Sequence, residues 1–419
     1  MHTLVFLEPG HFHAALTLGE RHPRVRDEIA VYATEGPELR DFLTLVDRFN
    51  RRAERPTRWR PVLRTGGDPL ARLIDERPGD VAILAGQNHR KMAWIGRLHD
   101  AGLHVLADKP WMVSAGALTE LGRILTSGPL VLEMMTGRHD VATAVEIRLV
   151  RERAVFGAFR PEAAGPAIEL ESVHHLEKLV AGTPLRRPAW FFDVRVQGDG
   201  LADIPTHLVN HAQGLLAESG VAGPLELVSA RRWPTPVPSA VFARITGLDG
   251  FPLELRADVE GDRLMFLGNG EMAFRQGERL VRLSSRWDLH LPAGGSDTHL
   301  TALHGTEAEI RVATGPETGW TRRILVIPRG DTRAAEAALG RAIASWRDEL
   351  PGVGLTRREA GLEITIPPAL GAGHESHFPL VLDELLTAAA AGGGPSPRAA
   401  TTLAKYELLA RAQVLADAR

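Results

Sequence analysis

The stretch Val81-Ala82-Ile83-Leu84-Ala85-Gly86-Gln87-Asn88-His89 has the pattern of a buried strand that ends in a small-residue turn and leads into a helix. The next apolar run, 104–107, ends in Asp108-Lys109-Pro110. In an open α/β sheet, ligands collect at the carboxyl ends of the strands. We therefore expect both turns, and Lys109 with them, to lie on a ligand-binding edge, although a surface lysine in an ordinary turn would give the same pattern.

The first 135 residues repeat this alternation of short apolar runs and helical periodicity. Such an alternation predicts a Rossmann-like, doubly wound parallel sheet with helices on both faces. The expected strands are 3–7, 29–33, 61–64, 80–85, 104–107 and 130–134, and the expected helices are 12–20, 37–53, 69–76, 90–101 and 115–126.

The pattern changes after an expected helix at 140–153, where β-like runs follow one another with turns between them. This favours a large, mostly antiparallel open-faced sheet in an α+β domain. The expected strands include 167–173, 225–230, 241–247, 253–259, 263–267, 308–313 and 323–327, with helices 200–218, 334–349 and 378–389 on one face. We expect a Rossmann-like dinucleotide-binding domain at 1–137, a substrate and catalytic domain at 138–391, a Gly/Pro linker at 392–398 and a C-terminal helix at 399–419.

Composition narrows the class of protein. The 419 residues are 44% hydrophobic and 24% charged, which is typical of a globular protein large enough for two cores. A net charge of -3 gives no basic field for nucleic acid, and the absence of cysteine excludes disulfides and thiolate chemistry. No apolar run approaches eighteen residues and no signal segment is evident, so we expect a cytoplasmic protein without a membrane partner.

A second informative stretch is Gly198-Asp199-Gly200-Leu201-Ala202-Asp203-Ile204-Pro205-Thr206-His207-Leu208-Val209-Asn210. It places a carboxylate and an imidazole four residues apart, which on a helix puts both on one face. Such an aspartate can orient the histidine as a general base. A core histidine beside a capping aspartate would have the same pattern, so the spacing alone leaves both interpretations open.

These segments together resemble the Gfo/Idh/MocA family of NAD(P)-dependent enzymes, named after glucose-fructose oxidoreductase and inositol dehydrogenase. The Glu-Lys-Pro segment of that family appears as Asp108-Lys109-Pro110, its Thr-Pro-Asn turn as Gly86-Gln87-Asn88, and its Asp-x-Gly-x-His-x-x-Asp segment as residues 203–210. More narrowly, residues 172–175, 184–193 and 373–378 look like a subgroup with its own oxidoreductase C-terminal domain. The resemblance implies an N-terminal domain that binds the dinucleotide and a sheet domain that presents the substrate.

The resemblance also implies a catalytic trio of Lys109, Asp203 and His207. Oxidation of a secondary alcohol sends hydride to the nicotinamide while a base removes the hydroxyl proton, and His207 is the expected base. Lys109 would hydrogen-bond the reacting oxygen, and Asp203 would orient the ring or bind a neighbouring hydroxyl. The expected cofactor-binding residues are Gly10, His11, Phe12, Glu35, Gly86, Asn88, Asp108 and Lys109.

The substrate side is expected to include His174, His175, Lys178 and His299 as hydroxyl-binding groups, each of which could equally be structural. Trp190 could stack on a sugar face or belong to the core. Asn210 replaces the final aspartate of the family segment. The many histidines lack an HExxH arrangement, and a structural zinc site without cysteine would be unusual, so we expect no metal site.

The largest departure from the family is the turn after the first strand, Glu8-Pro9-Gly10-His11-Phe12-His13, where a Gly-x-Gly-x-x-Gly is expected. Glu8 would bring negative charge near the phosphates, and His11 or His13 could compensate by donating hydrogen bonds. The second strand lacks its usual terminal acid, which leaves Glu35 as the candidate for the adenosine ribose. An acid there would repel a 2'-phosphate, so NAD is favoured over NADP.

The expected function is that of an NAD(P)-dependent oxidoreductase acting on a secondary hydroxyl of a sugar, glycoside or cyclitol-like polyol. One alternative is a redox-neutral cycle through a transient keto-sugar, as in an NAD-dependent glycosidase, epimerase or lyase. Another is a Rossmann-like binding or regulatory protein that has lost its cofactor, because of the altered glycine turn. From the resemblance alone, a homodimer or homotetramer is expected.

Overall fold

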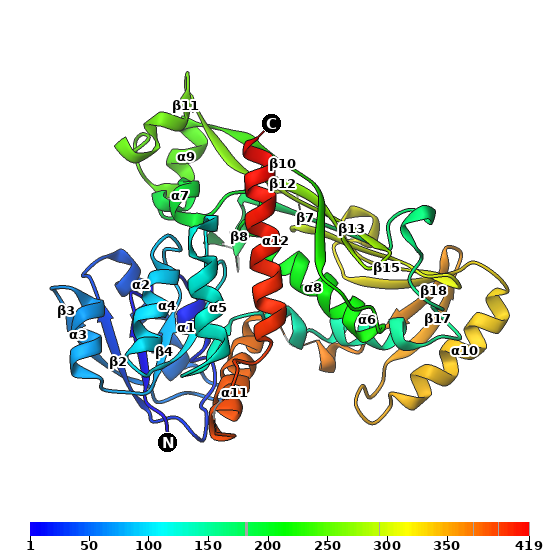
Figure 1. Ribbon diagram of the computed structural model, residues 1–419, viewed down its shortest axis with the longest axis horizontal. Helices are drawn as coiled ribbons and strands as arrows, with labels where there is room; N and C mark the ends of the chain where they lie inside the picture. The colour runs from blue at the N-terminus through cyan, green and yellow to red at the C-terminus, as the bar shows by residue number, and fades with distance from the viewer. Residues whose placement is uncertain (181–182, 293, 372, 393, 419) are drawn as a thin grey trace. The chain divides into compact units, whose positions relative to one another are not determined.

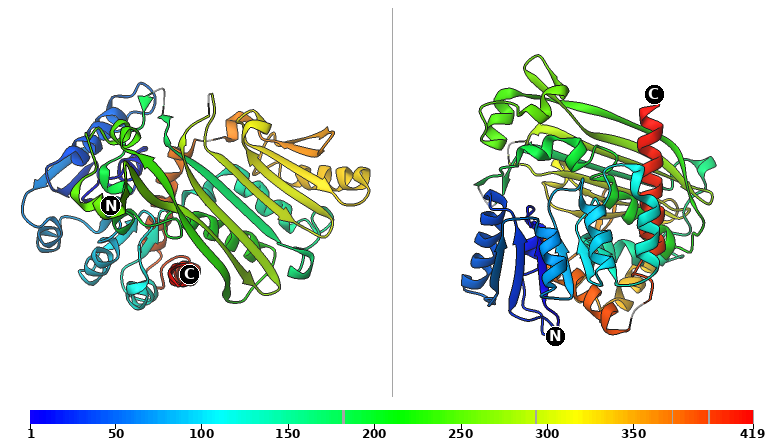
Figure 2. Two further views of the ribbon diagram at one scale, coloured as in Figure 1. Left: turned by 90° about the horizontal axis from the view of Figure 1, so that it is seen from above. Right: turned by 60° about the vertical axis from the view of Figure 1, so that its left-hand side comes forward.

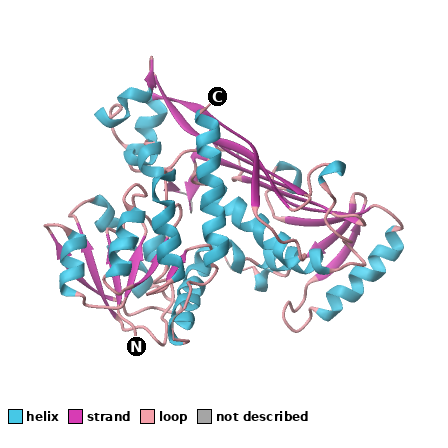
Figure 3. Ribbon diagram, in the orientation of Figure 1, coloured by secondary structure: helices cyan, strands magenta, loops and turns pink. Residues whose placement is uncertain are grey.

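The computed structural model describes residues 1–180, 183–292, 294–371, 373–392 and 394–418. It divides into two compact units, which Figures 1 and 3 show as ribbons. The first comprises Met1–His139 and Gly373–Tyr406, and the second comprises Asp140–Ala372 and Glu407–Arg419.

The first unit is built on a six-stranded parallel sheet with the strand order β3-β2-β1-β4-β5-β6. Its central strands are continuous apolar runs because both faces of the sheet are covered. The strand order reverses between β1 and β4, which is where a doubly wound sheet opens a crevice for ligands. The strands are β1 (Leu4–Leu7), β2 (Glu28–Ala33), β3 (Arg60–Thr65), β4 (Val81–Leu84), β5 (His104–Ala107) and β6 (Val131–Glu133).

The helices around this sheet follow the sequence pattern with one exception. They are α1 (His13–Leu16), α2 (Pro37–Arg51), α3 (Pro69–Glu76), α4 (Lys91–Asp100) and α5 (Leu118–Thr126). The predicted helix 12–20 is therefore wrong in length. After one helical turn, hydrogen bonds from Leu18 N to Ala15 O and from Gly19 N to Leu16 O form tight turns instead of a longer helix. The Thr17 hydroxyl donates to the Ala14 carbonyl.

The helix α11 (His377–Ala390) belongs to the first unit, not to the second sheet as the sequence analysis expected. Phe378, Val381 and Leu385 share one buried cluster with Leu4 and Phe6 of β1. Polar contacts hold the same helix, since Asp383 accepts hydrogen bonds from His22 at 2.8 Å and from Arg24 at 2.7 Å. Periodicity predicted the helix, but it could not show which of two apolar faces the helix would cover.

The segment expected as a linker, 392–398, includes one residue, 393, outside the described ranges. Ser396 is buried and ties the segment to the first unit, because its amide donates to Leu125 O at 2.8 Å and its hydroxyl accepts from Val131 N at 2.7 Å. The last helix, α12 (Ala399–Asp417), is anchored by Lys405 and Tyr406, whose side chains both contact the buried Glu133 carboxylate. Within the described ranges, no helix combines the length and apolar character needed to cross a membrane.

The second unit contains a large mixed sheet in which one pair, β13 with β7, is parallel and the other pairs are antiparallel. Its long strands lie side by side in Figure 2. The predicted α/β fold class, with a parallel first sheet and a mostly antiparallel second sheet, is confirmed. In sheet order the strands are β10 (Leu225–Pro238), β12 (Arg263–Gln276), β13 (Arg279–His290), β7 (Ile168–Glu177), β14 (Thr298–His304), β15 (Ala308–Thr314), β16 (Arg323–Pro328), β18 (Gly361–Thr365) and β17 (Gly354–Arg358), with β11 (Val259–Glu260) beside β12 and a separate pair β8 (Leu179–Val180) and β9 (Thr183–Pro184).

Two predicted strands of this unit are wrong. Residues 241–247 lie mostly in the helix α9 (Ser239–Thr246), and 253–259 lie mostly in a 3-10 helix, Leu253–Asp258. Gly247 ends α9 in the left-handed conformation that suits glycine, with its amide bonded to Ala243 O at 2.8 Å. Val241, Phe242 and Ile245 of α9 pack into a buried aromatic cluster, so tertiary packing outweighed their β propensity. The remaining helices are α6 (Val141–Arg151), α7 (Val194–Gln197), α8 (Pro205–Glu218) and α10 (Thr332–Ser345).

Candidate active site

The turn after β1 keeps a glycine-like backbone without the glycine. Glu8 has φ 44°, in the left-handed region that residues with a Cβ rarely adopt. Its carboxylate accepts hydrogen bonds from the Thr34 amide at 3.1 Å and the Thr34 hydroxyl at 2.7 Å, at the end of β2. The Glu8 carboxylate, which was expected to bring negative charge near the phosphates, is therefore hydrogen-bonded to the end of β2.

The turns after β1 and β4 pack directly on each other. The His11 amide donates to Ala85 O at 2.9 Å, and a Cβ at Gly86 would lie 2.6 Å from the Glu8 carbonyl oxygen. Gly86 is thus required by this close approach. At Gly10, a Cβ would make only ordinary contacts, 3.5 Å or more from its neighbours, and φ there is not in the left-handed region.

Asp108, at the end of β5, is the centre of a buried polar cluster. The Lys91 ammonium contacts its Oδ1, and also donates to Asn88 Oδ1 at 2.6 Å and to the Asp108 carbonyl at 3.0 Å. The other carboxylate oxygen, Oδ2, lies 3.3 Å from His11 Nδ1 and 3.4 Å from His13 Nδ1. Asn88 and Asp108 were predicted at this edge from the strand pattern, whereas Lys91 was not among the predicted site residues.

Electrostatics keeps this cluster in a defined charge state. Burial by itself would raise the pKa of Asp108, but Lys91 and the two histidines hold it well below its usual value, so the group is a carboxylate. Burial, together with the neighbouring His11, lowers the pKa of His13 to about 3, so its imidazole is neutral.

Lys109 follows Asp108 at the carboxyl end of β5, as predicted, and precedes Pro110 through a cis peptide bond. The next residue, Trp111, is fully buried, and its amide donates to the Tyr406 hydroxyl at 2.7 Å. Lys109 thus lies between the end of a sheet strand and a buried aromatic residue.

Glu35, the predicted ribose ligand, is exposed. Its carboxylate accepts a hydrogen bond from the Thr65 hydroxyl at 3.1 Å, at the end of β3.

In the second unit, Asp203 and His207 lie where the chain enters α8. The predicted helix 200–218 begins later, at Pro205, and Asp203 belongs to the turns just before it. Asp203 is buried and accepts from Gln197 Nε2 at 3.2 Å, while its carbonyl accepts from the Thr206 hydroxyl at 2.6 Å. Gly200 is needed here because a Cβ would lie 2.1 Å from the Asn269 backbone. His207 and Asn210 follow in the first turns of α8, both partly buried.

The predicted substrate-side histidines converge on Asp297, which the sequence analysis missed. Lys178 Nζ donates to Asp297 Oδ2 at 2.6 Å, and both the amide and Nδ1 of His175 lie 3.1 Å from Oδ1. His174 Nδ1 lies 3.3 Å from Oδ2. The Ser172 hydroxyl joins His174, at 2.8 Å from Nε2, to His299, at 2.9 Å from Nδ1.

This network surrounds the charged Asp297 carboxylate with an ammonium group and imidazole rings. Burial alone would raise the pKa of Asp297, but His174 and Lys178 lower it far below its usual range. Burial lowers the pKa of His174, which favours the neutral ring. The result is a group of hydroxyl, imidazole and ammonium donors on neighbouring strands β7 and β14, a combination suited to binding sugar hydroxyls.

Arg187 is a second residue that the sequence analysis did not single out. Its guanidinium lies 4.5 Å from the Phe191 ring centre and 5.0 Å from that of Trp287, and burial lowers its pKa to about 10. Trp190 packs against the same aromatic cluster. Neither Arg187 nor Asp297 has a local sequence signal, because their partners lie elsewhere in the chain.

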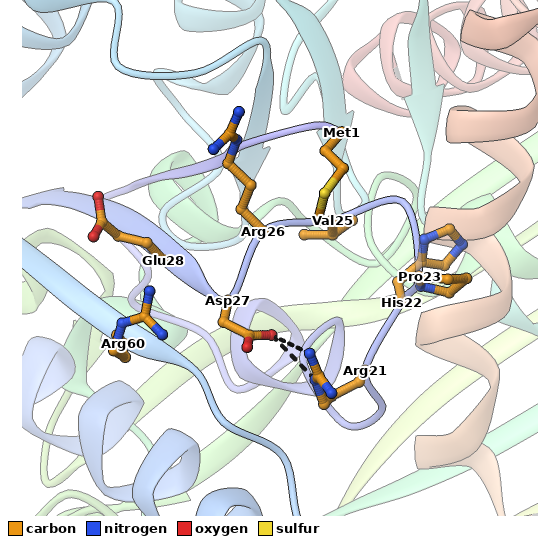
Figure 4. Close-up of a pocket in the computed structure, with 9 residues that line it drawn as sticks. All are labelled: Met1, Arg21, His22, Pro23, Val25, Arg26, Asp27, Glu28 and Arg60. Atoms are coloured by element: carbon orange, nitrogen blue, oxygen red, sulfur yellow. Dashed lines mark hydrogen bonds and ion pairs between the residues drawn. The ribbon is translucent and has the colours of Figure 1, made fainter.

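Two other histidines form carboxylate pairs of their own. His211 Nε2 lies 2.6 Å from the buried Glu146, which raises its pKa although burial opposes this, and His290 Nδ1 lies 2.6 Å from Glu177. A surface hollow of about 560 Å³ lies at the amino end of β2, away from the carboxyl edge of the sheet. Figure 4 shows its lining, including the Arg21–Asp27 ion pair, and none of the predicted site residues belongs to it.

Comparison with known proteins gives a family match over residues 145–417, to the family described as "Putative oxidoreductase C terminal domain". Curated proteins give no match. Among solved structures, a "putative oxidoreductase" from Parabacteroides merdae is similar over 100% of this chain and 98% of its own, with 33% identity and a TM-score of 0.93.

More distant structures share the fold. Levoglucosan dehydrogenase in complex with NADH and L-sorbose has 16% identity and a TM-score of 0.65, covering 100% of this chain and 98% of its own. An oxidoreductase from Agrobacterium radiobacter in complex with NAD+, L-tartaric acid and magnesium has 12% identity and a TM-score of 0.58, covering 99% and 96%.

Proposed function

We propose, from the premise that this chain belongs to the oxidoreductase family of the Gfo/Idh/MocA type defined by that C-terminal domain, that it transfers hydride between NAD and a secondary hydroxyl of a sugar, glycoside or cyclitol-like polyol. One observation carries the proposal. The strand order reverses at β1 and β4, and the polar groups Asn88, Asp108 and Lys109 gather on the carboxyl edge beside that point. Two structures of the same fold are complexes with NADH or NAD+.

The residues on this edge fit a dinucleotide. The turn at Glu8 has the left-handed backbone of a glycine, and its carboxylate is held by Thr34 instead of pointing freely outward. Gly10, His11 and Phe12 would follow the pyrophosphate, while Asn88, Asp108 and Lys109 would face the nicotinamide side. Glu8 is better placed than Glu35 to meet the adenosine ribose, because it joins the ends of β1 and β2. An acidic group there favours NAD over NADP.

The catalytic roles fall to Lys109, Asp203 and His207. NAD, when bound, would supply the acceptor for the hydride that leaves the carbon carrying the hydroxyl. His207 takes the hydroxyl proton, and Lys109 donates a hydrogen bond to the oxygen as it becomes a carbonyl. Asp203, fixed by Gln197, orients the base. The donors around Asp297 bind the remaining hydroxyls, which supports a polyhydroxylated substrate.

Turnover with a panel of sugars, glycosides and cyclitols tests this function. Net NADH formation is the expected result, and His207→Ala and Lys109→Ala should each lower kcat by about 10²- to 10⁴-fold while NAD still binds. His290→Ala is the matched control, because that histidine is exposed, pairs with Glu177 and is not among the predicted site residues. Substrate conversion without net NADH would replace the dehydrogenase by a redox-neutral cycle. Wild-type turnover in both variants would remove these residues from the mechanism.

We also propose that the protein works as a homo-oligomer, as the family resemblance implies. The sheet of the second unit carries a hollow of about 490 Å³ lined by charged residues of both signs, including Glu171, Glu271, Arg282 and Arg311, which is compatible with a self-complementary surface. Light scattering of the purified protein measures its mass, and a monomer at micromolar concentration would contradict the proposal.

A further inference from the structure

We propose that His11, His13 and Asp108 bind a divalent transition-metal ion of the zinc type. In the described part of the chain, these three residues offer two imidazole nitrogens and one carboxylate oxygen that all lie within 4.8 Å of one another. His11 comes from the turn after β1, His13 is the first residue of α1, and Asp108 follows the end of β5. All three belong to the first unit.

The distances in the cluster suit an ion better than direct hydrogen bonds. Asp108 Oδ2 lies 3.3 Å from His11 Nδ1 and 3.4 Å from His13 Nδ1, which is longer than a usual N–H···O contact of about 2.9 Å. Ligands about 2.0 Å from a tetrahedral ion lie about 3.3 Å from each other. The spacing therefore matches the edge of a zinc coordination polyhedron.

Apart from these long contacts with Asp108, the two imidazole nitrogens have no hydrogen-bond partner among the described residues. Among the described residues, neither His11 Nδ1 nor His13 Nδ1 makes a hydrogen bond, although both atoms are buried. Buried polar atoms are normally satisfied, and each exception calls for an explanation such as an ion. By contrast, the buried Lys91 and Asn88 side chains of the same cluster are hydrogen-bonded to each other.

The surroundings fix the ligands in place. Lys91 holds the second oxygen of Asp108, so Oδ2 is presented toward the two rings. The His11 backbone is bonded to Ala85, and the His13 ring packs 4.7 Å from Phe378 and 4.0 Å from His11. Because the Lys91 ammonium draws charge from the carboxylate, we expect affinity weaker than that of structural zinc sites.

Three protein ligands leave a coordination position open, as in catalytic rather than structural sites. In a glycine-rich turn, a phosphate is held by backbone amides and a helix N-terminus. Here α1 has four residues, and His13 stands at the position of the last glycine. A cation at this position would supply the missing positive charge, so the open position would take a phosphate oxygen. This last step rests on the proposed function, because it needs a bound dinucleotide.

Metal binding is tested on the full-length protein without NAD. After removal of bound metal with a chelator, the protein is titrated with Co²⁺, followed by visible absorption, and with Zn²⁺, followed by calorimetry. One ion per chain is expected, and His11→Asn and His13→Asn should each weaken binding about 100-fold or more. His290→Asn, which removes an exposed histidine, should bind as the wild type does. No saturable binding by the wild type, or wild-type affinity in both His11→Asn and His13→Asn, would overturn the site.

Folding and the role of the ion need separate readouts. His11 is about one third exposed, so His11→Asn should unfold at the wild-type temperature and keeps the test informative if His13→Asn does not fold. Inorganic pyrophosphate should shift the Co²⁺ spectrum, and sorbitol should not. If NAD binds equally with and without metal, the phosphate role is wrong while the proposed function stands. If the metal binds and NAD does not bind in either state, the proposed function fails and the metal site stands.

Discussion

The Asp108 and Asp297 clusters have almost the same composition and differ in how their histidines are used. Each contains a buried or largely buried aspartate, a lysine on one oxygen and two histidines nearby. Around Asp297, His175 and Lys178 make hydrogen bonds of 3.1 and 2.6 Å, and Ser172 joins His174 to the network. Around Asp108, the Nδ1 atoms of both histidines lie 3.3 to 3.4 Å from Oδ2 and make no hydrogen bond. His174 Nδ1 is likewise 3.3 Å from Asp297, but that ring is held by Ser172 through Nε2. The Asp297 cluster therefore suits the binding of hydroxyl groups, and the Asp108 cluster suits the binding of a metal ion.

The largest expected effect is on metal binding, and it should separate the two clusters. Asp108→Asn removes the charged ligand and should weaken Zn²⁺ binding by about 100-fold or more, whereas Asp297→Asn should leave it unchanged. Calorimetric titration of both variants measures the difference. Because Asp108 pairs with the buried Lys91, thermal unfolding must be followed in parallel, and a loss of Zn²⁺ binding in Asp297→Asn alone would reverse the assignment.

The second prediction concerns the Asp297 cluster and the binding of substrate. Asp297→Asn should raise the KM for a polyol substrate by about 10- to 100-fold, because charge-assisted hydrogen bonds contribute about 1.5–3 kcal/mol each and the variant disturbs the donors that Asp297 holds. Steady-state kinetics with the preferred substrate gives this value, and the Kd for NAD serves as the control. If kcat falls and KM is constant, the network acts in the chemical step instead of in substrate binding.

A smaller effect is expected at Ser172, which is buried between His174 and His299. Ser172→Ala removes two hydrogen bonds of the network and should raise KM by about 2- to 10-fold, as a net loss of about 0.5–1.5 kcal/mol implies. Ser284→Ala, on the neighbouring strand β13, is the matched serine control. Equal KM values in the two variants would mean that the Ser172 bridge does not position the histidines.

The smallest expected effect is a pH dependence of stability. The pKa of His174 is lowered by burial below its usual 6.5, so the folded state prefers the neutral ring. Its contribution to the free energy of unfolding is complete above pH 6.5 and is lost as the pH falls below that value, because the unfolded chain then binds the proton more readily. Urea midpoints measured from pH 8 to 5 should decline less for His174→Gln than for the wild type. An identical decline would assign the acid sensitivity to other groups.

The sequence predicted the first sheet well because its central strands are short apolar runs that the structure buries, as at Val81–Leu84. It failed where tertiary contacts decide, as for residues 241–247, which form α9, and for α11, which joins the first unit's core. Asn88 and Lys109 could be assigned to the carboxyl edge because each lies in the turn after a strand. Lys91 and His13 contact Asp108, which lies 17 and 95 positions further along the chain, and Asp297 contacts Lys178, which lies 119 positions before it. A local sequence pattern cannot indicate contacts over such separations.

The central claim is that the altered turn at Glu8 to His13 still serves an NAD-dependent oxidoreductase. Calorimetric titration of the full-length protein with NAD, in the presence of Zn²⁺ and again after its removal, tests this most directly. The account predicts saturable binding of one NAD per chain, tighter than that of NADP. Absence of binding at millimolar NAD in both conditions would contradict it.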